Sequence, residues 1–207
     1  MEPPPEPQSR LNPLPIQKLS IRLRERGLEC LLYLTHPENI YSILARGVLP
    51  YNEVRRLGIP HEDIANPEVQ QRRNISVFDK DLHDYVPLYM ARRNPVLWVR
   101  RLLPRAYIRL KLEVADKEGT VFSDCNASSY WAKFHRSHED ISCIPWEVIV
   151  APTWTGFPNG KRKRCAEILV PGPVEPSFII DVRTKYAVNV PPGYEGLLIE
   201  DHDYLSA

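Results

Sequence analysis

The chain has 207 residues, 43% of them hydrophobic, which is enough to bury the core of one domain. Its formal net charge is +1, so bulk charge does not require a polyanionic partner and any basic surface must be local. The sequence has no run of about 18 apolar residues, and its acidic, proline-rich N-terminus lacks the layout of a signal peptide. We therefore expect no transmembrane helix and a cytoplasmic protein.

The composition also predicts the division of the chain. Residues 1–15 are expected to form a disordered proline-rich arm, residues 16–190 a single domain, and residues 191–207 a tail of uncertain structure. Twenty-one prolines against nine glycines favour short elements joined by ordered turns.

The N-terminal third predicts a helix, a strand and a second helix. The segment "IQKLSIRLRERG" is amphipathic and ends at Gly27, while "CLLYL" at residues 30–34 is typical of a buried strand. Thr35 and Glu38 have the spacing of a capping box, which predicts that the next helix begins there and ends at Gly47. Its predicted core face is Ile40, Ile43 and Leu44.

The rest of the chain is richer in strands. Residues 48–66 are expected to form loops and a short turn at "YNEVRRLG", "PEVQQRR" a short helix, and "NPVLWVRRLLP" either a helix or a strand. The predicted strands are "PLYMA", residues 106–114, "TVFSD", "WEVIVAPTW", "CAEILV" and "SFIIDV". Many strands with a few helices near the N-terminus predict an α+β fold.

Glu167 is the first candidate functional residue, because it interrupts the apolar strand "CAEILV". Burying a carboxylate costs several kcal/mol unless another group pairs with it. The alternative is a glutamate on the solvent face of an edge strand, paired with one of the basic residues that precede it.

Basic residues form two further candidate sites. Lys161 to Arg164 make a basic run before that strand, and Arg72–Arg73 close a predicted helix. With Arg93 and nearby aromatics, the run suits single-stranded nucleic acid, since bases can stack on aromatic rings. The simpler interpretations are a solvated loop or a localisation signal for the run, and a helix-dipole interaction rather than a diphosphate clamp for Arg72–Arg73.

Two other patterns bear on function. The segment "LHDYVPLYM" places His83, Asp84 and Tyr85 directly before apolar residues, so these side chains either cap a strand end or line the mouth of a cleft. The four cysteines lie far apart without the clustered spacing of a zinc site, so we expect reduced, mostly buried thiols and no metal.

Four segments, in order over about residues 30–182, resemble motifs of the DarT family of DNA ADP-ribosyltransferase toxins. "YLTHPENIYSILARGVL" resembles the opening element Tyr-His-x-Thr-His-x-x-Asn-Leu-x-x-Ile-Leu-x-x-Gly. "LHDYVPLYMARRNPVLW" resembles His-Asp-Tyr-Val-Pro-Phe-Tyr-Phe followed by Pro-Arg-Ser-Pro-Met-Leu-Tyr. "VFSDCNAS" resembles Phe-Thr-Asp-Gly-Asn-Ala, and "RCAEILV" resembles Arg-x-Ala-Glu-Phe-Leu-Val, which carries the family's catalytic glutamate.

The resemblance implies an α+β ADP-ribosyltransferase fold, with two small packed β-sheets around an NAD cleft. It implies transfer of ADP-ribose from NAD, without a metal, to thymine or guanine in single-stranded DNA, and a macrodomain antitoxin as partner. Glu167 takes the catalytic position, and Arg73 rather than Arg72 takes the arginine that reaches the NAD phosphates.

The resemblance also suggests binding residues. The NAD contacts are expected at Tyr33, Thr35, Asn39, Arg73 and Tyr85. The nucleic-acid contacts are expected at Lys161, Arg162, Lys163, Arg164 and Arg93, mostly in the substrate-recognising loop 155–164. Tyr33 stands where the family has a histidine, and a tyrosine hydroxyl can also donate and accept a hydrogen bond. The alternatives are an ADP-ribosyltransferase for RNA or protein and a non-catalytic nucleic-acid-binding module.

Overall fold

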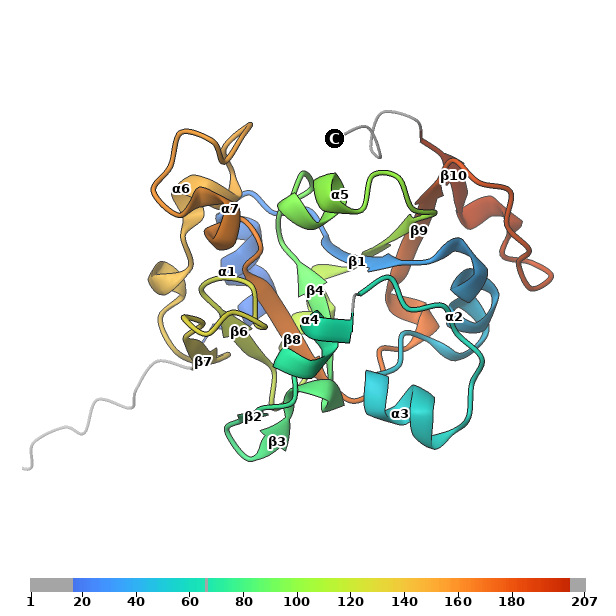
Figure 1. The fold of residues 1–207 in the computed structure, drawn as a ribbon, viewed down its shortest axis with the longest axis horizontal. Helices are drawn as coiled ribbons and strands as arrows, with labels where there is room; N and C mark the ends of the chain where they lie inside the picture. The colour runs from blue at the N-terminus through green and yellow to red at the C-terminus, as the bar shows by residue number, and fades with distance from the viewer. Residues whose placement is uncertain (1–16, 66, 202–207) are drawn as a thin grey trace, which may run out of the picture.

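The computed structural model describes residues 17–65 and 67–201, and a mixed eight-stranded sheet forms its centre (Figure 1). The strand order is β10-β9-β5-β1-β4-β8-β6-β7, and every pairing is antiparallel except that of β10 with β9. The strands are β1 (Leu31–Thr35), β4 (Tyr85–Tyr89), β5 (Ala106–Leu110), β6 (Val121–Ser123), β7 (Phe134–Arg136), β8 (Glu167–Pro171), β9 (Ile179–Thr184) and β10 (Leu198–Glu200). A separate two-stranded ribbon consists of β2 (Ser76–Val77) and β3 (Lys80–Asp81).

Short helices surround the sheet, with α2 and α3 at the right of Figure 1 and α6 and α7 at the left. They are α1 (Leu19–Glu25), α2 (Ile40–Arg46), α3 (Tyr51–Arg56), α4 (Pro67–Arg72), α5 (Pro95–Val99), α6 (Trp146–Ile149) and α7 (Gly160–Lys163). Single 3₁₀ turns are η1 (Pro37–Asn39), η2 (Leu82–Asp84), η3 (Leu112–Asp116), η4 (Ile141–Cys143), η5 (Pro176–Phe178) and η6 (Glu195–Leu197). Proline begins several of them, as the composition predicted, since its fixed φ suits the first helical turn.

The α+β class is confirmed, and the predicted pair of sheets takes the form of one large sheet and one ribbon. The predicted arm, residues 1–15, lies outside the described residues. Within the predicted tail, residues 198–200 add β10 to the sheet edge. No helix in residues 17–65 or 67–201 has the length and hydropathy needed to cross a membrane.

Several local predictions were wrong. Thr35 is the last residue of β1, where it pairs with Ala106, and it does not cap the helical turn that follows. His36 takes the cap position instead, and its Nδ1 accepts from the Glu38 N–H. Residues 146–149 form a helix rather than a strand, β5 ends at Leu110 rather than at residue 114, and residues 51–56 form a helix where a short turn was predicted.

Alternation along the strands separates the apolar side chains into clusters on the two faces of the sheet. In β8, Ile168 and Val170 join the main core, together with Leu31 of β1. Leu169 packs in a smaller cluster on the other face, with Val77 and residues of neighbouring strands. The same alternation turns Glu167 to the face of Leu169, away from the main core.

Gly47, which ends α2, is the position where the fold most clearly requires a glycine. Its φ is +88°, and a Cβ atom there would lie 2.1 Å from the carbonyl oxygen of Val174. The backbone approaches so closely because Val48 and Val174 form an isolated β-bridge. This contact ties the end of α2 to the segment that follows β8.

Gly47→Ala is therefore expected to destabilise the protein by more than about 3 kcal/mol, because the clash is with backbone and adds to the cost of positive φ. Gly58→Ala is the matched control: φ is +60° there, but nothing lies within 4 Å of the added Cβ. That variant should lose only about 1 kcal/mol. Urea denaturation of both variants measures the difference, and equal losses would contradict the proposed clash.

Candidate active site

Glu167 and Arg73 form a buried ion pair. Arg73 Nη1 lies 3.1 Å from Glu167 Oε2, and Arg73 is 9% and Glu167 0% exposed. The second carboxylate oxygen, Oε1, accepts a hydrogen bond from the backbone N–H of Ala127 at 2.9 Å. The buried carboxylate thus has both a counter-charge and a backbone donor, which together offset the cost of removing it from water.

Glu167 is positioned by the middle of the sheet, not by an edge. β8 lies between β4 and β6, Glu167 is paired with Tyr89, and its N–H donates to Ser123 Oγ at 3.2 Å. This arrangement excludes the interpretation of Glu167 as a solvent-facing glutamate on an edge strand. The nearest basic run does not supply its partner either, since that partner is Arg73, 94 residues earlier.

Arg73 is held by the end of α4. Its N–H donates to the carbonyl oxygens of Val69 and Gln70, which close the last turn. Arg73 Nη2 is buried and makes no hydrogen bond within the described residues. A buried guanidinium nitrogen without an acceptor is costly, so this atom is suited to a ligand oxygen.

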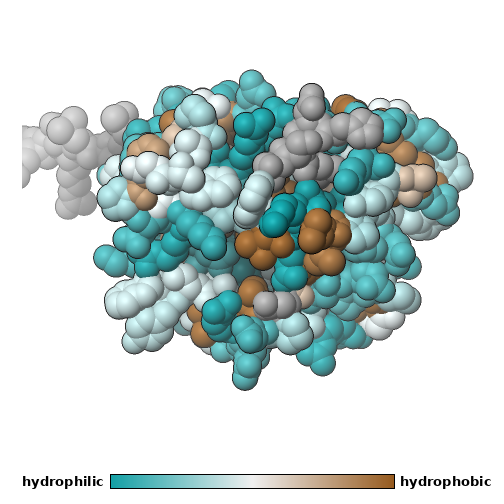
Figure 2. Space-filling model, turned by 45° about the horizontal axis from the view of Figure 1, so that its top comes forward, coloured by the Kyte–Doolittle hydropathy of each residue, from teal (hydrophilic) through white to brown (hydrophobic). Residues whose placement is uncertain are grey.

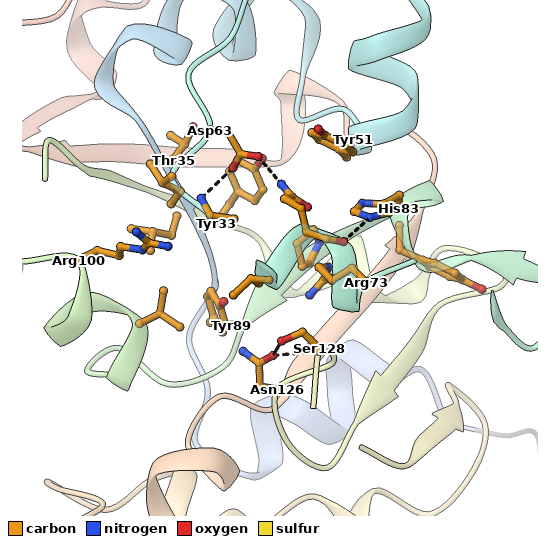
Figure 3. Close-up of a pocket in the computed structure, with 18 of the residues that line it drawn as sticks. Tyr33, Thr35, Tyr51, Asp63, Arg73, His83, Tyr89, Arg100, Asn126 and Ser128 are labelled. Carbon is orange, nitrogen blue, oxygen red and sulfur yellow. Dashed lines mark hydrogen bonds between the residues drawn. The ribbon is translucent and has the colours of Figure 1, made fainter. Parts of the chain in front are cut away.

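A cavity of about 790 Å³ lies beside this pair, within the size range of small-molecule sites. Figure 3 shows Tyr33, Thr35 and Asp63 on one side, Arg73 and His83 on another, and Asn126 and Ser128 opposite. Arg73 lines the cavity, whereas Glu167 lies behind it and does not. The structure therefore brings Tyr33, Thr35, Asn39, Arg73 and Tyr85, all predicted NAD-binding residues, to one cavity.

Thr35 and Asn39 organise the cavity wall. Asn39 Nδ2 donates to Thr35 Oγ1 at 3.1 Å and to the Glu62 carbonyl oxygen at 2.8 Å, and its Oδ1 accepts from the Glu62 N–H. This clamp fixes the segment that carries Asp63 across the cavity. Asp63 in turn accepts hydrogen bonds from Gln70 of α4 and from the Ala65 N–H.

Burial raises the pKa of two tyrosines and two thiols in and beside the site. Burial, with the nearby Asp63 carboxylate, raises the pKa of Tyr33 to about 12. Burial and the adjacent Glu167 carboxylate raise the pKa of Tyr89 well above its usual value. Burial also raises the pKa of Cys125 and of Cys165 to about 12 each, so neither thiol is suited to act as a nucleophile.

The segment His83–Tyr85 both holds neighbouring elements together and lines the cavity. Asp84 Oδ1 accepts from Asn52 Nδ2 of α3 at 2.8 Å, which is a bracing contact. The Tyr85 hydroxyl donates to the Val77 carbonyl oxygen at 3.4 Å, although the residue borders the cavity. His83 also borders the cavity: its ring lies 4.9 Å from that of Tyr51, and its Nε2 lies 3.2 Å from the Gln70 carbonyl oxygen.

The basic run lies in the short helix α7 and at its C-terminal cap, and its four side chains have different surroundings. Lys161 and Arg162 line the cavity, and Lys163 lies 3.7 Å from Glu147. Arg164 is 4% exposed, and its guanidinium donates to the carbonyl oxygens of Arg93, Val148, Ile149 and Ala151. This burial argues against the predicted contact of Arg164 with nucleic acid. Arg93 itself is exposed.

Arg164→Ala is expected to lower the free energy of unfolding by about 3 kcal/mol, since it leaves several buried carbonyl groups without a donor. Lys163→Ala is the matched control, because a solvent-exposed pair such as Lys163–Glu147 contributes at most about 1 kcal/mol. Urea denaturation of both variants compares them. A loss below 1 kcal/mol for Arg164→Ala would show that its hydrogen bonds are replaced by water.

Sequence reasoning missed several residues of the site. Asp63 and Tyr51 lie in or beside a segment predicted as loop, and no pattern marked them. Asn126 forms an Asx turn beside the cavity, in which its Oδ1 accepts from the Ser128 N–H. The next residue, Ala127, donates its N–H to Glu167, and no local sequence pattern predicted this hydrogen bond. Across residues 17–65 and 67–201, no group of His, Cys, Asp or Glu could hold a metal ion, and all four cysteines are free.

Apolar side chains gather near the mouth of the cavity. Figure 2 shows brown residues among teal ones on the face that carries α5. The exposed apolar side chains of this region are Trp98, Val99, Leu102 and Leu103. Val99 and Arg100 also line the cavity, so its entrance is partly apolar and partly cationic.

Comparison with known proteins gives one consistent answer. The sequence model described as "ssDNA thymidine ADP-ribosyltransferase, DarT" matches residues 32–189. A DNA ADP-ribosyl transferase–DNA ADP-ribosyl glycohydrolase fusion protein of Thermosipho africanus is 30% identical over 158 residues, 72% of this chain and 40% of the relative. A DNA ADP-ribosyl transferase of Thermus sp. is 29% identical over 154 residues, 67% of this chain and 72% of the relative.

Solved structures agree. Thermosipho africanus DarTG in complex with ADP-ribose has a TM-score of 0.68 at 26% identity, covering 77% of this chain and 44% of that one. Thermus sp. 2.9 DarT in complex with ADP-ribosylated ssDNA has a TM-score of 0.65 at 26% identity, covering 78% and 83%. The chain thus spans less than half of the fusion relative and most of the Thermus protein.

Proposed function

Because this chain belongs to the DarT family of single-stranded DNA thymidine ADP-ribosyltransferases, we propose that it transfers ADP-ribose from NAD to a base of single-stranded DNA. The observation that carries the proposal is the Arg73–Glu167 pair at the wall of the cavity. An anionic group and a cation with a free donor are what a reaction through a positively charged sugar and a diphosphate requires.

In the proposed reaction, the bond between the ribose C1′ and the nicotinamide nitrogen breaks, and nicotinamide leaves with the electron pair. A base nitrogen then bonds to C1′, and its proton passes to the Glu167 carboxylate and on to solvent. The same carboxylate stabilises the positive charge that develops on the sugar. Arg73 binds the diphosphate and so holds C1′ in line for attack.

Glu167 is fully covered, and its ion-pair partner Arg73 lines the cavity, so in the proposed reaction Arg73 moves to give the substrate access to Glu167. Diphosphate oxygens offer the acceptor that Arg73 Nη2 lacks, so NAD draws the guanidinium away from Glu167 and frees an acceptor for the ribose hydroxyls. Tyr33, which stays protonated up to about pH 12, can donate a hydrogen bond to the ribose in place of the family's histidine.

Thymine is the proposed acceptor base, following the description of the matching family. Guanine is the second candidate, and the observation behind it is the tyrosine at position 33 where the family motif has a histidine. The partner of the proposed toxin is a macrodomain antitoxin, supported by the Thermosipho africanus relative, in which a DNA ADP-ribosyl glycohydrolase is fused to the transferase. A cytoplasmic location belongs to the same proposal, because NAD and DNA are both present there.

The test is incubation of the protein with NAD and single-stranded oligonucleotides, read by mass. One oligonucleotide lacks thymine, a second lacks guanine, and a third is RNA. A gain of one ADP-ribosyl group that disappears only without thymine is the expected result. Loss only without guanine selects the second candidate, modification of RNA alone selects an RNA transferase, and binding without any modification would sink the enzymatic proposal.

A further inference from the structure

The loop between β6 and β7, residues 124–133, carries two neighbouring aromatic side chains to the surface. Tyr130 is 92% exposed and Trp131 is 67% exposed. Their ring centroids are 5.4 Å apart, with an interplanar angle of 88°. Tyr107 and Phe122, by contrast, are fully buried. Two large aromatic rings held side by side in solvent are typical of a binding surface, because burying them on a partner is favourable.

The loop is held in place by its own hydrogen bonds. Asp124 and Lys133 close its base: the Asp124 N–H donates to the Lys133 carbonyl oxygen at 3.2 Å, and the Lys133 N–H donates to Asp124 Oδ1 at 3.0 Å. Asn126 Oδ1 accepts from the Ser128 N–H, and the Trp131 N–H donates to Ser129 Oγ at 3.3 Å. A pre-organised loop loses little entropy when a ligand binds to its tip.

The same loop reaches the reaction site. The Ala127 N–H donates to Glu167 Oε1, and Asn126, Ser128 and Ser129 line the cavity. Trp131 follows Ala127 by four residues, so their Cα atoms lie within about 14 Å of each other. A base stacked on the aromatic pair therefore lies close enough to belong to the same strand as the base that enters the cavity.

Positive charge adjoins the aromatic loop. The Asn126 N–H donates to the Arg162 carbonyl oxygen at 3.4 Å, which places α7 against the loop. Lys161 and Arg162 of α7 line the same cavity as Asn126 and Arg73. Aromatic rings beside cations are the combination that binds single-stranded nucleic acid, with bases stacked and phosphates neutralised.

We propose that Tyr130 and Trp131 form a stacking platform for a base that flanks the modified base in single-stranded DNA. This inference rests on the proposed function and adds to it the residues that hold the neighbouring nucleotide. Stacking does not select one base strongly, so the platform positions the strand rather than reading its sequence.

The experiment uses an oligonucleotide that the wild-type protein modifies, in a series in which one nucleotide at a time is abasic. Dissociation constants are measured by fluorescence anisotropy without NAD. Trp131→Ala should weaken binding of the intact oligonucleotide about tenfold, which corresponds to about 1.4 kcal/mol. For the wild type, one flanking abasic position should cause the same loss, and for Trp131→Ala that position should cause no further loss. Trp131→Phe should restore most of the affinity.

Tyr41→Ala is the matched control, because Tyr41 is an exposed aromatic residue that does not line the cavity. It should leave the dissociation constant and transfer unchanged. If the wild type modifies DNA but Trp131→Ala binds it with unchanged affinity, the stacking proposal is overturned. A protein partner would then be the alternative ligand of Tyr130 and Trp131. The proposal is also overturned if the loss of affinity caused by Trp131→Ala adds to the loss caused by the abasic nucleotide at every position of the series. If the wild type modifies no oligonucleotide, the proposed function fails, and this inference fails with it.

Discussion

Glu167→Gln is expected to reduce ADP-ribose transfer at least about a thousandfold, while the protein still folds. The substitution removes the negative charge that stabilises the ribosyl cation and the base that takes the proton, and removing one such group typically costs 10² to 10³ or more in rate. The glutamine oxygen can still accept from the Ala127 N–H, so the local backbone is retained. The partner charge on Arg73 loses its anion, and we expect a loss of about 2 kcal/mol in stability.

The measurement is initial rate with saturating NAD and oligonucleotide, with circular dichroism as the check on folding. Glu147→Gln is the matched control: Glu147 is exposed beside Lys163 and should change the rate less than twofold. Transfer by Glu167→Gln within tenfold of the wild type would remove Glu167 from the mechanism.

Arg73→Ala is expected to weaken NAD binding about tenfold and to lower kcat/KM about a hundredfold or more. The residue is proposed to hold the diphosphate, so both binding and the position of C1′ depend on it. Arg73→Lys should recover only part of the activity, since lysine keeps the charge but not the planar fork of donors. Arg72→Ala should change both constants less than threefold, because Arg72 also borders the cavity but is exposed, and the buried partner of Glu167 is Arg73. Unchanged NAD affinity in Arg73→Ala, with Arg72→Ala impaired, would reverse the assignment.

A second variant separates the structural role of Arg73 from its role in catalysis. Arg73→Ala leaves the buried carboxylate of Glu167 without a counter-charge, which typically costs 3 to 5 kcal/mol. The double variant Arg73→Met/Glu167→Gln should regain much of that stability because it buries no charge, yet it should remain inactive. Recovery of activity in the double variant would mean that the pair acts only on folding.

The sequence predicted the site wherever a local pattern carried the information. A carboxylate within "CAEILV" can be read directly, and the structure places it in an interior strand. The pairing of Glu167 with Arg73 could not be read, because the two residues are 94 positions apart and only the β4–β8 register and the end of α4 bring them together.

The errors share a cause, which is that tertiary contacts overrode local preference. Residues 146–149 are rich in β-formers, but Pro145 precedes them and Trp146 Nε1 donates to the Ile141 carbonyl oxygen, which fixes a helical turn. Arg164 looked like its basic neighbours, but the carbonyl groups at the end of α6 accept its hydrogen bonds. Such partners cannot be seen in a run of four basic letters.

The separation of Arg73 and Glu167 along the chain also affects the order in which activity arises during synthesis. The ribosome makes α4 and the whole cavity wall from Tyr33 to Arg100 before it reaches β8. Until then, the nascent chain lacks the interior strand that joins β4 to β6, and it lacks the carboxylate. We therefore expect a product that stops before β8 to lack the proposed activity, because the proposed catalytic carboxylate arrives only with the β4–β8 pairing.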